Sequence, residues 1–138
     1  MAGSYLIDAP RGIVFSRGWG YLTDGEILEH ARRLAADPRF ASRFSQVTDF
    51  RDLSELRVTA KGVQRVSESN PFRRDARRAF VVASNEAFGM VRMFEQFADA
   101  EPGQFAVFRT LEPAMAWVGL EPSSCWPAAA PDETFGLS

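Results

Sequence analysis

The chain has 138 residues and a mass of 15.4 kDa, the size of one ordinary globular domain. Hydrophobic residues make up 46% and charged residues 25%, which excludes intrinsic disorder, and the single cysteine excludes a disulfide scaffold. The net charge of −2 argues against nucleic-acid binding, and no uninterrupted apolar stretch of about 18 residues is present to span a membrane.

The first part of the chain predicts a β-hairpin followed by a helix. Tyr5–Asp8 and Gly12–Trp19 are rich in β-forming residues and flank a Pro-Arg-Gly turn, which favours two antiparallel strands. Thr23 and Glu26 have the spacing of a capping box. Apolar residues then recur at helical intervals as far as the Asp-Pro pair at 37–38, where we expect this helix to end.

The middle of the chain predicts two strands separated by a loop and a helix. The strands are expected at Gln46–Phe50 and Ala79–Ala83, and the second is continuously apolar, as in a strand covered on both faces. Between them we expect a polar loop over Arg51–Thr59 and a helix over Thr59–Asn70, which Pro71 bounds.

The last part of the chain predicts a helix, a strand, a short helix and a tail. Ser84 or Asn85 should cap the next long helix. We expect the last strand at Gln104–Phe108 and a short helix at Leu111–Val118. From Gly119 onward the chain is rich in proline and small residues and is predicted to form a tail.

This order of elements indicates an α/β fold. Strands that alternate with helices favour a parallel sheet joined by right-handed crossovers, and the opening hairpin makes the sheet mixed. We therefore predict a single domain with a mixed, mostly parallel five-stranded sheet flanked by about four helices, with Ala79–Ala83 central. The domain is expected to cover residues 1–119, and the proline-rich C-terminal tail residues 120–138.

Three segments resemble the SpoIIAA-like fold of STAS domains, which include anti-anti-sigma factors and transporter tails. VTDFRD at 47–52 resembles the strand of this family that ends in an acidic position. AFVVASNEAFGMVRMFEQF at 79–97 and QFAVFRTLEPAMAWVG at 104–119 resemble strand-helix units of a bacterial subgroup related to STAS and CRAL-TRIO lipid-binding domains. The resemblance implies a regulatory module that binds a protein partner or its own copy. Its CRAL-TRIO side implies the alternative, a binder of a small apolar or anionic molecule or a lipid.

The resemblance also points to Thr59 as a possible phosphorylation site. Anti-anti-sigma factors are phosphorylated on the second serine of an Asp-Ser-Ser-Gly loop, and this position falls on Thr59. Arg57, Val58 and Ala60 depart from the rest of that pattern. A threonine at a helix N-terminus favours a phosphate but is also an ordinary cap, and both interpretations stay open.

Polar residues follow the ends of three predicted strands. Because ligands gather beyond the carboxyl ends of parallel strands, these residues are candidates for a loop that binds a ligand or partner. If the protein binds a small anion, we expect it at the loop from Asp49 to Thr59 or at the caps Ser84 and Asn85. The alternative is a structural use of each residue as an ion pair or helix cap. The candidates are Asp49, Arg51, Asp52, Ser84, Asn85 and Arg109.

No catalytic or metal-binding motif is evident. His30 is the only histidine and is predicted to be a surface or half-buried residue of the first helix, while Cys125 falls in the tail. Neither a zinc site nor a Cys–His pair is therefore indicated. We expect a non-enzymatic protein without a cofactor, and a cytoplasmic one because its first residues do not resemble a signal peptide.

One dense cationic run contains Arg73, Arg74, Arg77 and Arg78. Such a run is typical of solvated surface, and we interpret it as surface that leads into the following strand. The alternative is a site for an acidic partner, including the acidic C-terminal half of the chain itself.

The predicted helix after residue 85 carries two adjacent apolar stripes, although one stripe is enough to cover a sheet. The second stripe, which consists of Met90, Met93 and Phe97, is a candidate interface with a protein partner or in a homodimer. Packing on a neighbouring helix is the alternative. A ligand binder should have an apolar pocket under this helix, whereas an interaction module should have the helix packed flat with an exposed patch.

Overall fold

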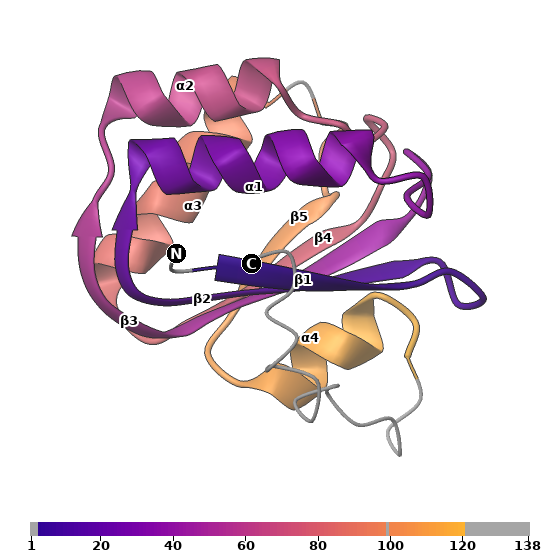
Figure 1. The fold of residues 1–138 in the computed structure, drawn as a ribbon. Coiled ribbons are helices and arrows are strands. Elements are labelled where there is room, and N and C mark those ends of the chain that lie inside the picture. The colour runs from indigo at the N-terminus through magenta and orange to yellow at the C-terminus, as the bar shows by residue number, and fades with distance from the viewer. Residues whose placement is uncertain (1–2, 99, 121–138) are drawn as a thin grey trace.

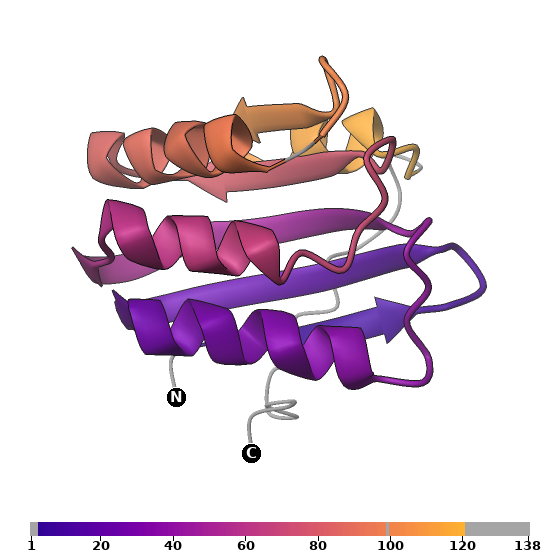
Figure 2. The ribbon, with the colours of Figure 1, turned by 90° about the horizontal axis from the view of Figure 1, so that it is seen from above.

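The computed structural model describes residues 3–98 and 100–120. The elements, in chain order, are β1 (Gly3–Asp8), β2 (Ile13–Thr23), α1 (Asp24–Ala36), β3 (Ser45–Arg57), α2 (Ala60–Glu68), β4 (Arg78–Val82), α3 (Asn85–Phe97), β5 (Phe105–Phe108) and α4 (Leu111–Trp117). The strands form one sheet in the spatial order β1-β2-β3-β4-β5. The helices α1, α2 and α3 cover one face of this sheet, and α4 lies on the other (Figure 1, Figure 2).

The connections between the strands explain this distribution of helices. β1 and β2 form an antiparallel hairpin, in whose turn Gly12 has a positive φ of 70°. The strands from β2 to β5 are parallel, and each crossover steps to the next strand along the sheet. Crossovers of one hand that always step in one direction place their helices on the same face, so α4, which follows the last strand, is left to cover the opposite face.

The predicted fold class is confirmed, with a mixed, mostly parallel sheet of five strands and four helices within the described residues. The strand predicted to be central, β4, lies inside the sheet between β3 and β5, and all five of its residues are buried, but the central strand is β3. The predicted caps also form. Thr23 and Glu26 make the capping box of α1, and the side chain of Ser84 accepts the Ala87 N–H at the start of α3.

The loop predicted over Arg51–Thr59 is wrong for most of its length, because β3 continues to Arg57. β2 likewise continues to Thr23, and the two strands pair along this extension with two register shifts. Leu53 and Leu56 pack on the core, and the residues between them are exposed. The spacing of three between Leu53 and Leu56, at a register shift, departs from the period of two of a regular strand. Most residues of this extension are also polar, so it resembles a loop in the sequence.

The sheet separates two apolar cores. Phe80 and Val82 of β4 belong to the core under the helices, together with Val91 of α3. The alternate residues of the same strand, Ala79 and Val81, belong to the core against α4. This division follows from the period of two in a strand, which sends successive side chains to opposite faces.

The second core extends one residue beyond the predicted domain boundary. Leu120, expected as the first residue of the tail, is buried in the core against α4, and its N–H donates to the Met115 carbonyl at 3.0 Å. The rest of the predicted tail, including Cys125, lies outside the described residues.

Candidate functional site

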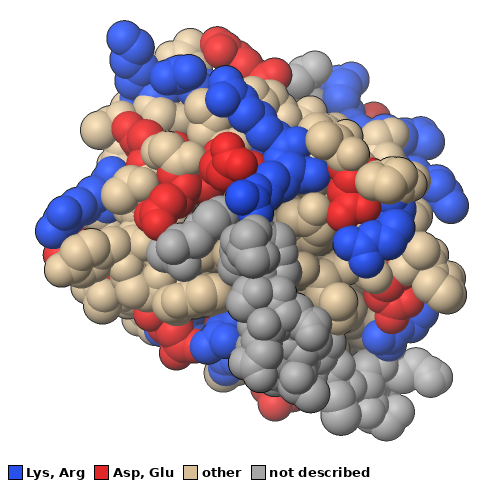
Figure 3. Space-filling view, viewed as in Figure 1, with Lys and Arg blue, Asp and Glu red and all other residues tan. Residues whose placement is uncertain are grey.

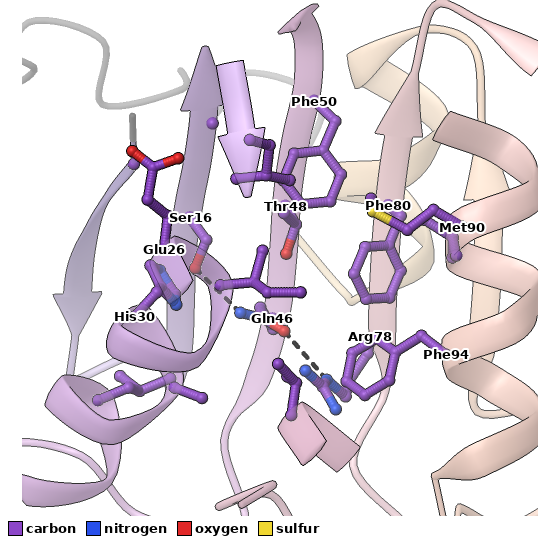
Figure 4. A pocket seen from close by; sticks show the side chains of 18 of the residues that line it. Ser16, Glu26, His30, Gln46, Thr48, Phe50, Arg78, Phe80, Met90 and Phe94 are labelled. Carbon is purple, nitrogen blue, oxygen red and sulfur yellow. Dashed lines mark hydrogen bonds between the residues drawn. The ribbon is translucent and has the colours of Figure 1, made fainter. Parts of the chain in front are cut away.

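A cavity of about 100 Å³ lies between the sheet and the three helices that cover it (Figure 4). Its helical side is largely apolar, with contributions from all three helices: Ile27 and Ala31 of α1, Val63 and Val66 of α2, and Met90 of α3. Glu26 and His30 of α1 are the polar residues on this side. A cavity of about 150 Å³ holds a molecule of benzene, so this one suits about four to six non-hydrogen atoms.

The sheet side of the cavity carries a row of buried polar side chains across three neighbouring strands (Figure 4). Gln46 Nε2 of β3 donates to Ser16 Oγ of β2 at 2.9 Å, and Arg78 Nε of β4 donates to Gln46 Oε1 at 3.0 Å. Arg78 Nη1 also donates to Asn70 Oδ1, at 3.0 Å, from the segment before β4. The row therefore links β2, β3 and β4 through side chains as well as through the backbone.

Arg78 is a buried cation that forms no ion pair with any residue of the described chain. The residue is 6% exposed, and its guanidinium lies 4.3, 4.9 and 5.2 Å from the ring centroids of Phe72, Phe94 and Phe105. Burial lowers the pKa of Arg78 to about 9, so the group keeps its charge at neutral pH. Cation–π contacts and amide oxygens offset only part of the cost of burying a charge.

Two polar atoms at the cavity have no hydrogen-bond partner among the residues that the structure describes. They are Thr48 Oγ1 and His30 Nε2, and both are buried. Thr48 is 4% exposed and lies on β3 two residues after Gln46, on the same face of the sheet. Buried polar atoms without partners are rare in folded proteins, and a bound molecule is one explanation for them.

The His30 ring projects from α1 toward the sheet (Figure 4). It stands edge-on to Tyr5 with ring centroids 5.5 Å apart, and it hydrogen-bonds to the Ser4 backbone. Burial lowers the pKa of His30 to about 4, and the nearby charges of Arg78 and Arg33 act in the same direction. The ring is therefore neutral at pH 7.

None of the six residues predicted for a ligand loop lines this cavity. At the end of the buried part of β3, Arg51 Nη2 and Asp49 Oδ2 form an ion pair at 2.9 Å, and Arg17 Nη2 and Asp52 Oδ2 form another at 2.9 Å. Asp49, Arg51 and Asp52 thus take part in ion pairs within the sheet, which is the structural role expected as the alternative to ligand binding.

The other three predicted residues lie after β4 and β5. Ser84 caps α3 through its side chain. Arg109 Nη2 donates to Asn85 Oδ1 at 3.1 Å, so the residue after β5 is linked to the first residue of α3. Binding of a small anion by these residues or by the β3 extension stays a prediction.

Thr59 is the N-cap of α2, and its hydroxyl is already engaged. Thr59 Oγ1 accepts the Gly62 N–H at 3.0 Å and donates to Asp24 Oδ2 at 2.6 Å, and the Thr59 N–H donates to Asp24 Oδ1 at 2.8 Å. A phosphoryl group on this oxygen would remove the hydrogen that it donates and lie against a carboxylate. Phosphorylation of Thr59 stays a prediction, and it would break the hydrogen bond from Thr59 Oγ1 to Asp24.

The candidate interface residues of α3 have different surroundings. Met90 is buried and lines the cavity, Met93 is half-buried against the core, and Phe97 is 42% exposed. Phe88, which lies on the same helix outside this row, is 38% exposed and lies near the guanidinium groups of Arg92 and Arg109. The helix therefore exposes Phe88 and Phe97 rather than the row of three.

The cationic run is surface for three of its four arginines. Arg73, Arg74 and Arg77 are exposed as interpreted, but the interpretation is wrong for Arg78, which is the first residue of β4 and is buried. The signal that could have found it is its position two residues before Phe80, in phase with the core-facing residues of an apolar strand. Ser16, Gln46 and Thr48 give a similar signal, as polar residues at alternate positions of β-rich segments.

Surface charge and metal ligands point to no other site. On the face seen in Figure 3, arginine and lysine side chains alternate with aspartate and glutamate. Across residues 3–98 and 100–120, no three His, Cys, Asp or Glu side chains gather as a metal ion would require. Within the same part of the chain, every helix is too short or too polar to cross a bilayer.

Comparisons with known proteins establish the fold and nothing finer. No family model matches the chain, and no curated protein matches it. A solved structure does match, that of an uncharacterised DUF3478-family protein from Shewanella loihica PV-4 with a SpoIIAA-like fold, at a TM-score of 0.58 and 17% identity. The match covers 85% of this chain and 94% of that one. The similarity expected from the sequence is therefore confirmed, and the chain has a SpoIIAA-like fold.

Proposed function

We propose that the protein binds a small, largely apolar molecule in the cavity under α1, α2 and α3. The observation that carries this proposal is a largely apolar cavity lined by two polar atoms without partners among the described residues, Thr48 Oγ1 of the sheet and His30 Nε2 of α1. An empty cavity of about 100 Å³ costs roughly 2 kcal/mol of stability at about 24 cal/mol per Å³. A bound molecule would restore the lost contacts and supply partners for Thr48 and His30.

The position of α3 supports this function over a regulatory interaction module. Ligand binding requires an apolar pocket under this helix, and Met90 and Phe94 of α3 line the cavity. The exposed Phe88 and Phe97 leave an interaction with a protein partner as a prediction. The chain offers a direct way to test ligand binding, because its methionines lie in different parts of the structure.

Labelled methionine methyl groups would report an occupied cavity by NMR. The Met90 methyl lines the cavity and Met115 lies in the opposite core, so Met115 is an internal control. Titration with butyramide, a neutral molecule of six non-hydrogen atoms by its formula, is expected to shift Met90 saturably at millimolar concentration and to leave Met115 in place.

Two variants sharpen this experiment. Ala31→Leu adds side-chain volume at the cavity wall and should abolish the Met90 shift, while Phe97→Ala, on the exposed side of α3, should leave it unchanged. A Met90 signal that never saturates, or that moves in parallel with Met115, would mean that the cavity takes up no ligand.

We also predict self-association through the exposed side of α3. Sedimentation velocity should detect a wild-type dimer, and Phe97→Ser should give a folded monomer, because an exposed apolar side chain at the interface is lost. A wild-type protein that sediments as a monomer at high micromolar concentration would contradict this prediction.

A further inference from the structure

We propose that the molecule bound in the cavity is a carboxylate with a short apolar chain, that Arg78 binds its carboxyl group, and that Thr48 donates a hydrogen bond to it. This inference rests on the proposed function and names the class of ligand. The apolar chain would lie against the helical side of the cavity, where Ala31, Val63 and Met90 supply the surface.

The charge of the cavity requires an anion. Arg78 is buried, and no described carboxylate pairs with it. Glu26 is the acidic residue that lines the cavity, but Thr23 N–H and Thr23 Oγ1 donate to its Oε1 at 3.1 and 3.2 Å in the cap of α1. A buried guanidinium is costly unless an anion accompanies it, and an anionic ligand would supply that partner.

The free donors match a carboxylate. A guanidinium has five N–H donors, and those of Arg78 make two hydrogen bonds within the described chain, to Gln46 and Asn70. Two of the remaining donors can bind both oxygens of a carboxylate in parallel. The three phenylalanine rings around the guanidinium hold it in one place, so its donors are already oriented when the ligand arrives.

Thr48 completes the anion site on the sheet. Figure 4 places the Thr48 hydroxyl on the same strand as Gln46, and Gln46 in turn bonds to Arg78. The Thr48 hydroxyl has no partner among the described residues and is almost fully buried, so it can donate to a carboxylate oxygen without breaking a bond to any of them. The cavity volume limits the buried part of the ligand to about four to six non-hydrogen atoms, and butyrate lies at the upper end of this range.

The test compares butyrate with butyramide, which has the same shape without the charge. With methionine-methyl NMR, butyrate is expected to bind at least about tenfold more tightly to the wild type, as for a hydrogen-bonded buried charge. A titration with octanoate shows whether the natural ligand is a short carboxylate or the carboxyl end of a longer acyl chain. Tighter binding of octanoate than butyrate supports a longer ligand that leaves the cavity, and weaker binding supports a short one; both support a carboxylate.

Two variants separate the anion site from the cavity. Arg78→Met should remove the preference for butyrate while butyramide still shifts Met90. Thr48→Val, which keeps the shape of the side chain, should lower the affinity for butyrate severalfold without lowering the melting temperature. This variant also tests the anion site if Arg78→Met fails to fold.

The outcomes that overturn the two proposals differ. Equal binding of butyrate and butyramide would remove the carboxylate proposal and leave the cavity function standing. Failure of both to shift Met90 would remove both. If Arg78→Met still bound butyrate tenfold more tightly than butyramide, Arg78 would not belong to the anion site. If Thr48→Val bound butyrate as tightly as the wild type, Thr48 would not belong to it.

Discussion

Lowering the pH from about 7 to about 4.5 is expected to reduce the free energy of unfolding by about 2–3 kcal/mol through His30 alone. The His30 ring has a pKa of about 4 in the folded protein, against 6.5 for an exposed histidine. Between these values the unfolded chain binds a proton that the folded chain does not, so stability is lost as the pH falls through this window. Urea unfolding at both pH values measures the change.

The control for this prediction is His30→Gln, which has no group that titrates in the same window. Its stability should change much less between the two pH values, because the chain has one histidine. Asp37, whose pKa the Arg39 guanidinium lowers to about 2, stays ionised in the folded protein, and it contributes little because its unfolded pKa of 3.8 lies below this window. An equal loss of stability in His30→Gln and the wild type would contradict the assignment to His30.

Replacing Gly62 by alanine is expected to lower the free energy of unfolding by about 1–3 kcal/mol, although alanine is the better helix former. A Cβ on Gly62 would overlap the Asp24 carboxylate, which accepts the N–H and the hydroxyl of Thr59 and so joins the starts of α1 and α2. The carboxylate would have to move, and both hydrogen bonds would be lost. Chemical denaturation of the purified variant measures the effect.

In a double-mutant cycle, the effect of Gly62→Ala on the free energy of unfolding should change sign when Asp24 is also replaced. In an Asp24→Ala background the obstacle is absent, so Gly62→Ala should raise stability by about 0.5–1 kcal/mol. Gly89→Ala is the matched control, because Gly89 lies in α3 with open space around it. This substitution should raise the stability of the protein by a similar amount. A destabilising Gly62→Ala in both backgrounds would show that Asp24 is not the cause.

The candidate site was predicted less well than the fold, and the reason is physical. Asp49, Arg51 and Asp52 stand at the end of the strand that the sequence predicts, which is a local property, and local reasoning finds them readily although β3 continues past them. Arg78 stands in a run of exposed arginines, so its neighbours in the sequence suggest surface. Only the alternation from Arg78 to Phe80 and Val82 points inward, and a five-residue strand gives a short signal.

The sequence by itself determined the local elements and the class of fold. The capping box at Thr23, the apolar run before Ala83 and the turn signals specify helices and strands through contacts between near neighbours. The alternation of these elements then limits the sheet to a mixed, mostly parallel one. These properties need no knowledge of which distant residues meet.

Only the tertiary structure decided which polar residues are buried together. Ser16 and Gln46 are 30 positions apart and Gln46 and Arg78 are 32 apart, yet the pairing of β2, β3 and β4 brings them into one row. The cavity above them depends on how three helices rest on the sheet, which no single helix pattern specifies. Strand register and helix packing are sums of many distant contacts, so the buried arginine and its unpartnered neighbours become visible only when the chain is folded.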